Sequence, residues 1–320
     1  MFETFLPYMQ IVAGCAGLLA GGEFLVSGAV CISKRLGLSA FFIGLTVISW
    51  TTSAPEIAVS IDSVLQGAGD LTMGNIVGSN TANILLVLAL TALVMPIAIK
   101  KKMGRKDIFV MVGTAIALLM IGFIFGEVGR VIGFLFLAAL FGYLAFTYLA
   151  EKRRGTTDTY TAEEVKGAKS LPLAAVFVVG GIGALVLSAN WLVSGATTIA
   201  ENFGVSQAVI GLTVVAVGTS LPEVATCVIS AFRGHSELAV GNIVGTNIFN
   251  ILGVLGLTAA VKPLAIHPHI MYMDIPFMIL CSVALAVMLL ARGKISRLTG
   301  AFFLVVYVGY VIASYMVTIG

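Results

Sequence analysis

Two glutamates, Glu56 and Glu223, each lie in an otherwise apolar stretch of the chain, in the contexts TTSAPEIA and GTSLPEVA. A proline directly precedes each of them, and proline interrupts a helix because it lacks the N–H donor and clashes with the preceding turn. Ser53 and Ser220 stand three residues before the glutamates, which is the spacing of a capping box at a helix start. We therefore predict two broken helices, each restarting next to a carboxylate.

Hydroxyl and amide side chains accompany these carboxylates at helical spacing. The stripes are Ser49, Ser53 and Glu56; Ala216, Ser220 and Glu223; Asn75, Ser79 and Asn83; and Asn242, Thr246 and Asn250. If they converge, the centre holds two carboxylates with hydroxyl and amide oxygens, and neither sulfur nor imidazole. Ca²⁺ takes about 6–8 oxygen ligands, whereas softer metals prefer Cys or His. Two carboxylates balance one Ca²⁺ or two monovalent ions, so the pattern predicts a hard-cation site suited to exchange.

The two glutamate segments belong to a long internal repeat. Residues 24–97 and 191–264 align without a gap at a constant offset of 167, and GNIVGSNTANIL in the first copy matches GNIVGTNIFNIL in the second. Each copy also contains a GxxxG pair, Gly74/Gly78 or Gly241/Gly245, which we expect to permit close helix packing rather than ligand binding.

Composition places the chain in a membrane. Of its 320 residues, 59% are hydrophobic and only 10% are charged, against about 25% charged in soluble domains. We expect ten apolar spans, each near the ~20 residues that a bilayer crossing requires. Their approximate bounds are 6–30, 38–65, 71–97, 107–126, 130–150, 172–197, 205–232, 238–262, 270–291 and 298–318. The four cysteines fall in or at the ends of these spans without metal-ligand spacing, so we expect neither a disulfide framework nor a cofactor.

Depth in the membrane also bears on the role of the glutamates. An acidic residue at bilayer depth costs about 2.5–3.5 kcal/mol even on the mild insertion scale. A helix cap returns only ~1 kcal/mol. A capping role alone therefore does not account for Glu56 and Glu223, and a functional role is expected.

The basic residues predict the topology. With the N-terminus outside and ten alternating spans, all of the 18 Lys and Arg residues except Arg130 and Lys262 fall on the inner side. This is the positive-inside pattern, so the charge orients the chain rather than binding nucleic acid. Five spans in each half is an odd number, so the two copies insert in opposite senses. An inverted-topology repeat of this kind is typical of secondary transporters, whose sites lie at the midplane between the halves.

The motifs TSAPE and GTSLPE, each followed by GN-x-x-G-[ST]-N, resemble the two α-repeats of the Ca²⁺/cation antiporter superfamily. Within it, the chain looks like a prokaryotic sodium/calcium exchanger. The resemblance implies an all-α polytopic fold of ten transmembrane helices in two inverted five-helix repeats, with an ion site between the broken helices 2, 3, 7 and 8. It also implies that the long helices 1 and 6 slide as a gate between outward-open and inward-open states.

The resemblance implies an ion-ligand set at the matching motif positions. These residues are Glu56, Glu223, Thr52, Ser53, Ser79, Asn83, Thr219, Ser220, Thr246 and Asn250. Some sodium/calcium members carry Asp where this chain has Asn250, so the site holds two formal negative charges rather than three. The counter-ion is therefore open between Na⁺ and H⁺.

We expect a secondary antiporter, not an enzyme, that exports Ca²⁺ against an inward Na⁺ gradient. The alternatives are an H⁺/Ca²⁺ exchanger, in which the glutamates take up protons, and a cation channel. A channel fits less well because the polar residues gather at one depth rather than along a pore. An intramembrane enzyme is excluded, since the chain has no HExxH, no GxSxG and no histidine within a span.

The expected organisation is a first repeat at 1–150, a cytoplasmic linker at 151–170 and a second repeat at 171–320. The protein is expected in the plasma or inner membrane with both termini outside. Its expected partners are the lipid bilayer and the transported Ca²⁺ and Na⁺, and a monomer is expected to suffice for transport. Glu23, inside the first span, is either a pathway residue or an interface residue.

Overall fold

The computed structural model describes residues 2–99, 104–154, 170–203 and 216–319. Nine helical segments within these ranges are long and apolar enough to cross a membrane, and Leu221–Phe232 is a shorter apolar helix. The expected all-α polytopic fold is confirmed. Most of the predicted linker 151–170 and the first half of the predicted span 205–232 lie outside the described residues.

Within the described residues, the two halves contribute similar but not identical successions of elements. The first half contains α1 (Phe2–Leu36), α2 (Ala40–Ile43), the π-helical turn η1 (Gly44–Ile48), α3 (Ser49–Thr52), α4 (Ala54–Leu65), α5 (Gly69–Ala82), the π-helical turn η2 (Asn83–Val87), α6 (Leu88–Val94), β1 (Ile97–Ala98), α7 (Arg105–Phe125), β2 (Glu127–Val128) and α8 (Arg130–Arg154). The second half contains α9 (Leu171–Asn202), α11 (Ala216–Thr219), α12 (Leu221–Phe232), α13 (Ser236–Phe249), the π-helical turn η5 (Asn250–Leu255), α14 (Gly256–Val261), β3 (Leu264–Ala265), the π-helical turn η6 (Ile270–Asp274), α15 (Ile275–Ala291), β4 (Lys294–Ile295) and α16 (Arg297–Ile319).

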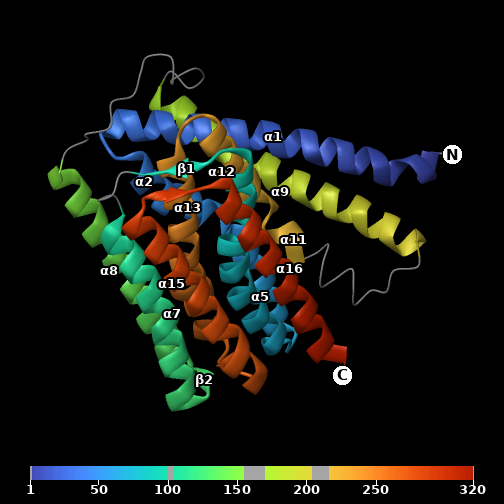
Figure 1. The fold of residues 1–320 in the computed structure, drawn as a ribbon, viewed down its shortest axis with the longest axis vertical. Coiled ribbons are helices and arrows are strands. Elements are labelled where there is room, and N and C mark those ends of the chain that lie inside the picture. The colour runs from blue at the N-terminus through green and yellow to red at the C-terminus, as the bar shows by residue number, and fades with distance from the viewer. Residues whose placement is uncertain (1, 100–103, 155–169, 204–215, 320) are drawn as a thin grey trace.

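The two long helices α1 and α9 lie side by side across one end of the bundle (Figure 1). The helices α7, α8 and α15 cross their direction at a steep angle. Both long helices extend past the predicted spans, because residues such as Lys34 and Arg35 continue the α1 helix beyond its apolar stretch. Small residues let the two backbones approach closely. A Cβ added at Gly21 would lie 2.9 Å from the Gly181 carbonyl, and one at Gly28 would lie 2.7 Å from the Ala174 carbonyl. The helices therefore run antiparallel with their backbones in contact.

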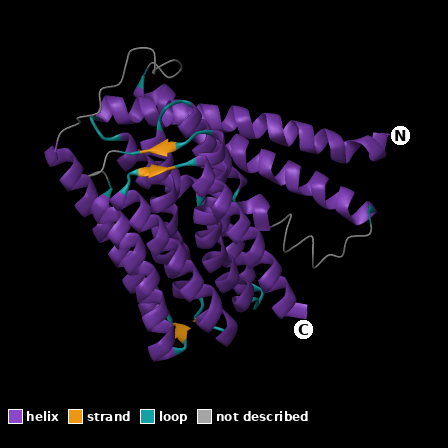
Figure 2. Ribbon diagram, viewed as in Figure 1, coloured by secondary structure: helices purple, strands orange, loops and turns teal. Residues whose placement is uncertain are grey.

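An approximate twofold relation between the halves follows from the strand pairs. β1 pairs antiparallel with β4, with Ile97 opposite Ile295, and β2 pairs antiparallel with β3, with Val128 opposite Leu264. The offset of 167 exchanges these two pairs, and they lie at opposite ends of the bundle (Figure 2). Equivalent segments at opposite ends are what an inverted-topology repeat requires.

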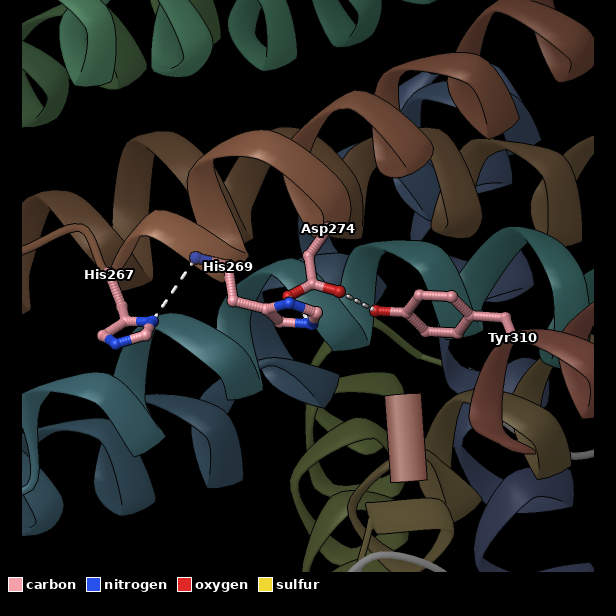
Figure 3. A network of polar contacts seen from close by, with 4 residues as sticks. All are labelled: His267, His269, Asp274 and Tyr310. Carbon is pink, nitrogen blue, oxygen red and sulfur yellow. Dashed lines mark hydrogen bonds and ion pairs between the residues drawn. The ribbon is translucent and has the colours of Figure 1, made fainter. Parts of the chain in front are cut away.

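Side chains at the periphery obey the same relation. The Tyr143 hydroxyl donates to Asp107 Oδ1 at 2.6 Å, and the equivalent Tyr310 hydroxyl donates to Asp274 Oδ1 at 2.8 Å. The second pair tethers α16 to the start of α15, where His269 lies 3.8 Å from the other Asp274 oxygen (Figure 3). The repeat thus extends beyond the aligned 74-residue blocks at 24–97 and 191–264.

Arginines close two helix ends in the same symmetric way. Arg130 donates to the Val261 carbonyl at the end of α14 at 3.2 Å, and Arg297 donates to the equivalent Val94 carbonyl at the end of α6 at 3.3 Å. The last carbonyls of a helix have no partner within it, and a basic side chain satisfies them. In both cases an arginine of one half closes a helix of the other half.

Candidate ion site

Two helix breaks bring the glutamates into the interior. The helix carrying Ser49–Thr52 stops at Ser53 and restarts with Pro55 in its first turn, and the equivalent helix stops at Ser220 and restarts with Pro222. Glu56 and Glu223 then fall in the first turns of α4 and α12. The predicted breaks are confirmed, and helix N-termini, which favour negative charge, face the two carboxylates.

The capping-box prediction is wrong. Neither Ser53 nor Ser220 makes a side-chain capping bond to the helix that follows it. The Ser53 hydroxyl instead donates to Asn250 Oδ1 of the other half at 3.3 Å. A contact between the halves has replaced the local one, because the break faces the opposite repeat rather than water.

The two carboxylates are buried, and each lies within range of the other's charge. Glu56 is 2% exposed and Glu223 is 1% exposed. They lie close enough for their charges to interact, and the Thr52 side chain lies beside Glu223. Among the described residues, Glu56 Oε2 and both carboxylate oxygens of Glu223 have no hydrogen-bond partner. Buried charges are normally paired or bound to a metal ion, so these oxygens form an acceptor cluster suited to a cation.

Amide and hydroxyl groups of both halves form hydrogen bonds in the interior. Ser49 donates to the Asn242 backbone carbonyl at 2.9 Å, and Thr246 donates to Asn242 Oδ1 at 3.2 Å. Asn83 donates through Nδ2 to Asn247 Oδ1 at 3.1 Å. The bonds of Ser49 and Asn83 join the first repeat to the second, whereas the Thr246 bond lies within the second repeat. The predicted stripes of Ser49 and Asn242 therefore meet between the halves.

The two amide ligands expected from the resemblance begin irregular helical turns. Asn83 opens η2 and Asn250 opens η5, both of which are π-helical. Single π-turns inside α-helices frequently occur at functional sites, because the extra residue widens the turn and redirects side chains. No pattern in the sequence predicted these π-helical turns.

Most residues of the expected ligand set lie in the interior. Those that are buried are Glu56, Glu223, Thr52, Ser53, Ser79, Asn83, Ser220, Thr246 and Asn250, whereas Thr219, at the end of α11, is half-buried. Direct contacts join Ser53 to Asn250 and bring Thr52 next to Glu223. Ser79 lines a cavity of about 160 Å³ between α5 and α16, together with Asn75 and Tyr310.

Close helix packing holds the second repeat's stripe against the first repeat. A Cβ at Gly245 would collide with the Ser49 hydroxyl and lie 2.8 Å from the Leu45 carbonyl carbon, and one at Gly241 would lie 3.0 Å from the Phe41 carbonyl carbon. The packing role predicted for Gly241 and Gly245 is therefore confirmed. The same prediction is wrong for the equivalent pair, Gly74 and Gly78. Among the described residues nothing lies within 4 Å of a Cβ at either glycine, because both line the cavity beside α16.

Two other polar contacts involve residues considered in the sequence. Glu23 forms an ion pair with Arg233, the residue that ends α12, and both side chains are partly exposed. Cys227 is buried and accepts a hydrogen bond from Asn242 Nδ2 at 3.4 Å. Cys227 therefore behaves as a small interior residue with a weak polar contact, as expected for the cysteines.

Sequence reasoning missed two buried amides near the expected ligands, Asn80 and Asn247. Both belong to the repeated motif GN-x-x-G-[ST]-N, where they are the last asparagine. Both are buried. Their presence in both copies was the signal that could have identified them.

Known proteins share the sequence pattern and the fold of this chain. A profile of the family described as sodium/calcium exchanger protein matches residues 6–149 and 173–316, which is most of the chain and both repeats. The chain belongs to the sodium/calcium exchanger family. It is therefore a multi-pass membrane antiporter of a transporter family and not an enzyme.

Relatives of this family match along nearly the whole chain. The putative antiporter CaxA of Alkalimonas amylolytica is 36% identical over 309 residues, covering 94% of this chain and 96% of its own length. The sodium/calcium exchanger MaX1 of Methanosarcina acetivorans is 29% identical over 347 residues, covering 97% and 99%. The inner membrane protein YrbG of Escherichia coli K12 is 34% identical over 290 residues, covering 88% of each chain.

A solved structure of the sodium-calcium exchanger NCX_Mj, soaked with 10 mM Na⁺ and no Ca²⁺, has the same fold. The TM-score is 0.82 at 30% identity, with 97% of this chain and 99% of that chain covered. A structure described as the sodium/calcium exchanger from Methanococcus jannaschii gives a TM-score of 0.83 at 28% identity, covering 96% and 98%. The fold implied by the sequence motifs is thereby confirmed.

Proposed function

We propose that this exchanger expels Ca²⁺ in return for Na⁺ by alternating access, and that both ions use one site built around Glu56 and Glu223. The observation that carries the proposal is a pair of buried carboxylates, close enough for their charges to interact, of which three oxygens lack hydrogen-bond partners among the described residues. One Ca²⁺ or two monovalent cations balance this charge. The surrounding hydroxyl and amide oxygens supply the further ligands that Ca²⁺ prefers.

Competition for shared carboxylates explains exchange rather than leak. A site with two unbalanced buried charges is costly when empty, because the interior does not solvate them. Reorientation across the membrane is therefore favoured when the site carries either Ca²⁺ or monovalent ions. Binding of one load requires release of the other, and alternating access then couples the two fluxes.

H⁺ is the second candidate for the counter-ion, and one observation favours it. Asn250 supplies an amide rather than a third carboxylate, and its Oδ1 accepts from Ser53. Without a third charge, the load that balances Ca²⁺ is two monovalent ions, which two protons on Glu56 and Glu223 also provide. The distribution of basic residues supports an orientation with both termini outside.

The test is ⁴⁵Ca²⁺ uptake into proteoliposomes, with an outward Na⁺ gradient or a pH gradient imposed separately. We expect uptake driven by Na⁺ and lost in Glu56→Gln, which removes the charge while keeping the side-chain shape. Glu127→Gln is the matched control, because Glu127 is exposed in β2 away from the site. Uptake driven only by the pH gradient would establish the proton-coupled alternative. Flux that requires no counter-ion, or that Glu56→Gln leaves intact, would contradict the proposal.

A further inference from the structure

Asn80 and Asn247 occupy equivalent positions in the two halves, three residues before the amides Asn83 and Asn250. They are 1% and 2% exposed. Neither belongs to the ligand set that the family motif implies. A buried amide requires partners for its oxygen and its nitrogen, and every buried polar group without one calls for an explanation.

Asn247 has its partners. Its Oδ1 accepts from Asn83 Nδ2 at 3.1 Å, and its Nδ2 points to Met111 Sδ at 3.7 Å. The bond to Asn83 has a chemical consequence. An amide presents either its NH₂, which repels a cation, or its carbonyl oxygen, which binds one. Because Asn247 holds the NH₂ of Asn83, the oxygen of Asn83 is left for the ion.

The equivalent bond in the other half would run from Asn250 Nδ2 to Asn80 Oδ1. Within the described part of the chain, Asn250 Nδ2 and both amide atoms of Asn80 lack a hydrogen-bond partner. Exchanging the oxygen and nitrogen of Asn80 does not change this, since neither atom is paired. The donor and the acceptor that symmetry would join are thus both present, buried and unjoined. Asn250 instead uses its Oδ1 to accept from Ser53.

The inverted repeat offers an explanation for why one amide pair is made and the equivalent pair is not. In such a transporter, alternating access is largely a movement of one repeat against the other around a fixed site. Because the two repeats are equivalent in sequence, we take the two access states to exchange the arrangements of the two halves. A contact made in one half and open in the other is then expected to reverse when the protein opens to the opposite side. The strand pairs and the Asp–Tyr pairs, in contrast, are made in both halves and need not change.

We propose that Asn247 and Asn80 are positioning residues for Asn83 and Asn250, and that the two amide pairs are made alternately in the two access states. The inference rests on the proposed function, because it takes Asn83 and Asn250 as ion ligands. Asn247 turns the oxygen of Asn83 toward the ion in the state described here. Asn80 does the same for Asn250 in the state that opens to the opposite side.

The experiment compares Asn247→Leu with Asn80→Leu, since leucine keeps the size of asparagine and removes both hydrogen-bonding groups. The measurement is the KM for Ca²⁺ on each face of the membrane, in vesicles of defined orientation, with the maximal rate as a second readout. We expect each variant to raise the KM about tenfold on one face only, and the two variants to affect opposite faces. Asn247→Asp and Asn80→Asp keep the acceptor oxygen and are expected to restore the KM in part.

A purely structural role predicts a different result. Equal changes on both faces, changes on the same face for both variants, or no change would overturn the proposal. If the leucine variants do not fold, Asn247→Ala and Asn80→Ala, which add no branched side chain, are judged by the same comparison. Failure of the proposed function is distinguishable, because the wild-type protein would then lack Ca²⁺ flux coupled to a counter-ion. Coupled flux that depends on Glu56 but shows no sidedness in these variants would contradict this inference alone.

Discussion

The central helices α5 and α13 carry nearly the same motif but lie in different surroundings. In α13, every residue from Leu238 to Phe249 is buried, and Asn242 bonds with groups of Ser49, Thr246 and Cys227. In α5, Asn75 Nδ2 and the Asn80 amide lack partners among the described residues, and Gly74 and Gly78 line a cavity. The repeat therefore determines the fold of both halves, whereas polar pairing at the centre distinguishes them.

At the periphery, in contrast, the two halves make the same contacts. The strand pairs, the Asp–Tyr pairs and the arginines at the helix ends are made equally in both halves. The contacts made in both halves stabilise the peripheral scaffold. The contacts made in only one half lie in the interior, as Glu56 and Glu223 do. This is the distribution expected of a transporter whose centre must adopt two arrangements within a stable frame.

The largest expected effect concerns the two glutamates, one from each half. Glu56→Gln and Glu223→Gln should each lower Ca²⁺ uptake by at least about a hundredfold, because either change leaves one charge against a divalent ion. A loss of ~2.8 kcal/mol in cation binding already gives a factor of one hundred. Uptake in proteoliposomes measures this. An effect confined to one of the two glutamates would show that the carboxylates are not shared by the transported ions.

A smaller effect is expected from filling the close contact of α13. Gly245→Ala places a methyl group against the Ser49 hydroxyl and the Leu45 backbone. Overpacking of this kind costs about 1–3 kcal/mol. Thermal unfolding in detergent should show a lower Tm, and transport should fall because Ser49 is displaced. Gly142→Ala is the control, since among the described residues nothing lies within 4 Å of a Cβ at Gly142. Equal Tm values for the two variants would refute the packing argument.

The two amides provide a sharper comparison. In Asn250→Asp, the new carboxylate still accepts from Ser53 and removes an unpaired NH₂. In Asn83→Asp, the carboxylate faces the Asn247 oxygen that formerly accepted its NH₂. We expect Asn83→Asp to lower uptake about tenfold relative to Asn250→Asp, equivalent to ~1.4 kcal/mol.

Asn250→Asp also tests the counter-ion. A third carboxylate would require a third monovalent charge to balance the unloaded site, so the dependence of uptake on Na⁺ concentration should steepen. The measurement is Ca²⁺ uptake across a series of Na⁺ and pH gradients. Unaltered Na⁺ and pH dependence would mean that residue 250 does not set the counter-ion.

The smallest effect is expected where the halves are equivalent. Tyr143→Phe and Tyr310→Phe each remove one hydrogen bond to an aspartate, a loss of about 1 kcal/mol. The two variants should lower the Tm by similar amounts in thermal unfolding. A large difference between them would show that the peripheral pairs also belong to the changing part of the molecule.

Much of this arrangement could be predicted from the sequence, because it depends on chain-local signals. Apolar length predicts the spans, proline predicts the breaks beside Glu56 and Glu223, and the offset of 167 predicts two matching halves. The contacts across the halves could not be predicted in this way. Ser53 has the spacing of a local cap, yet it bonds to Asn250, which is 197 residues away. Asn80 and Asn247 close the same motif, GN-x-x-G-[ST]-N, so this motif does not distinguish the paired amide from the unpaired one.

The strand pairs have a consequence for how the chain is made. β1 belongs to the first half, but its partner β4 follows the ninth of the expected spans. The Ile99 N–H likewise donates to the Gly293 carbonyl, at 2.8 Å, which is synthesised much later. A nascent first half thus leaves the ribosome with an open backbone edge and with the glycine-lined side of α1 uncovered. We expect assembly to finish only when the last spans have entered the membrane, so that premature termination yields fragments for proteolysis rather than half-size transporters.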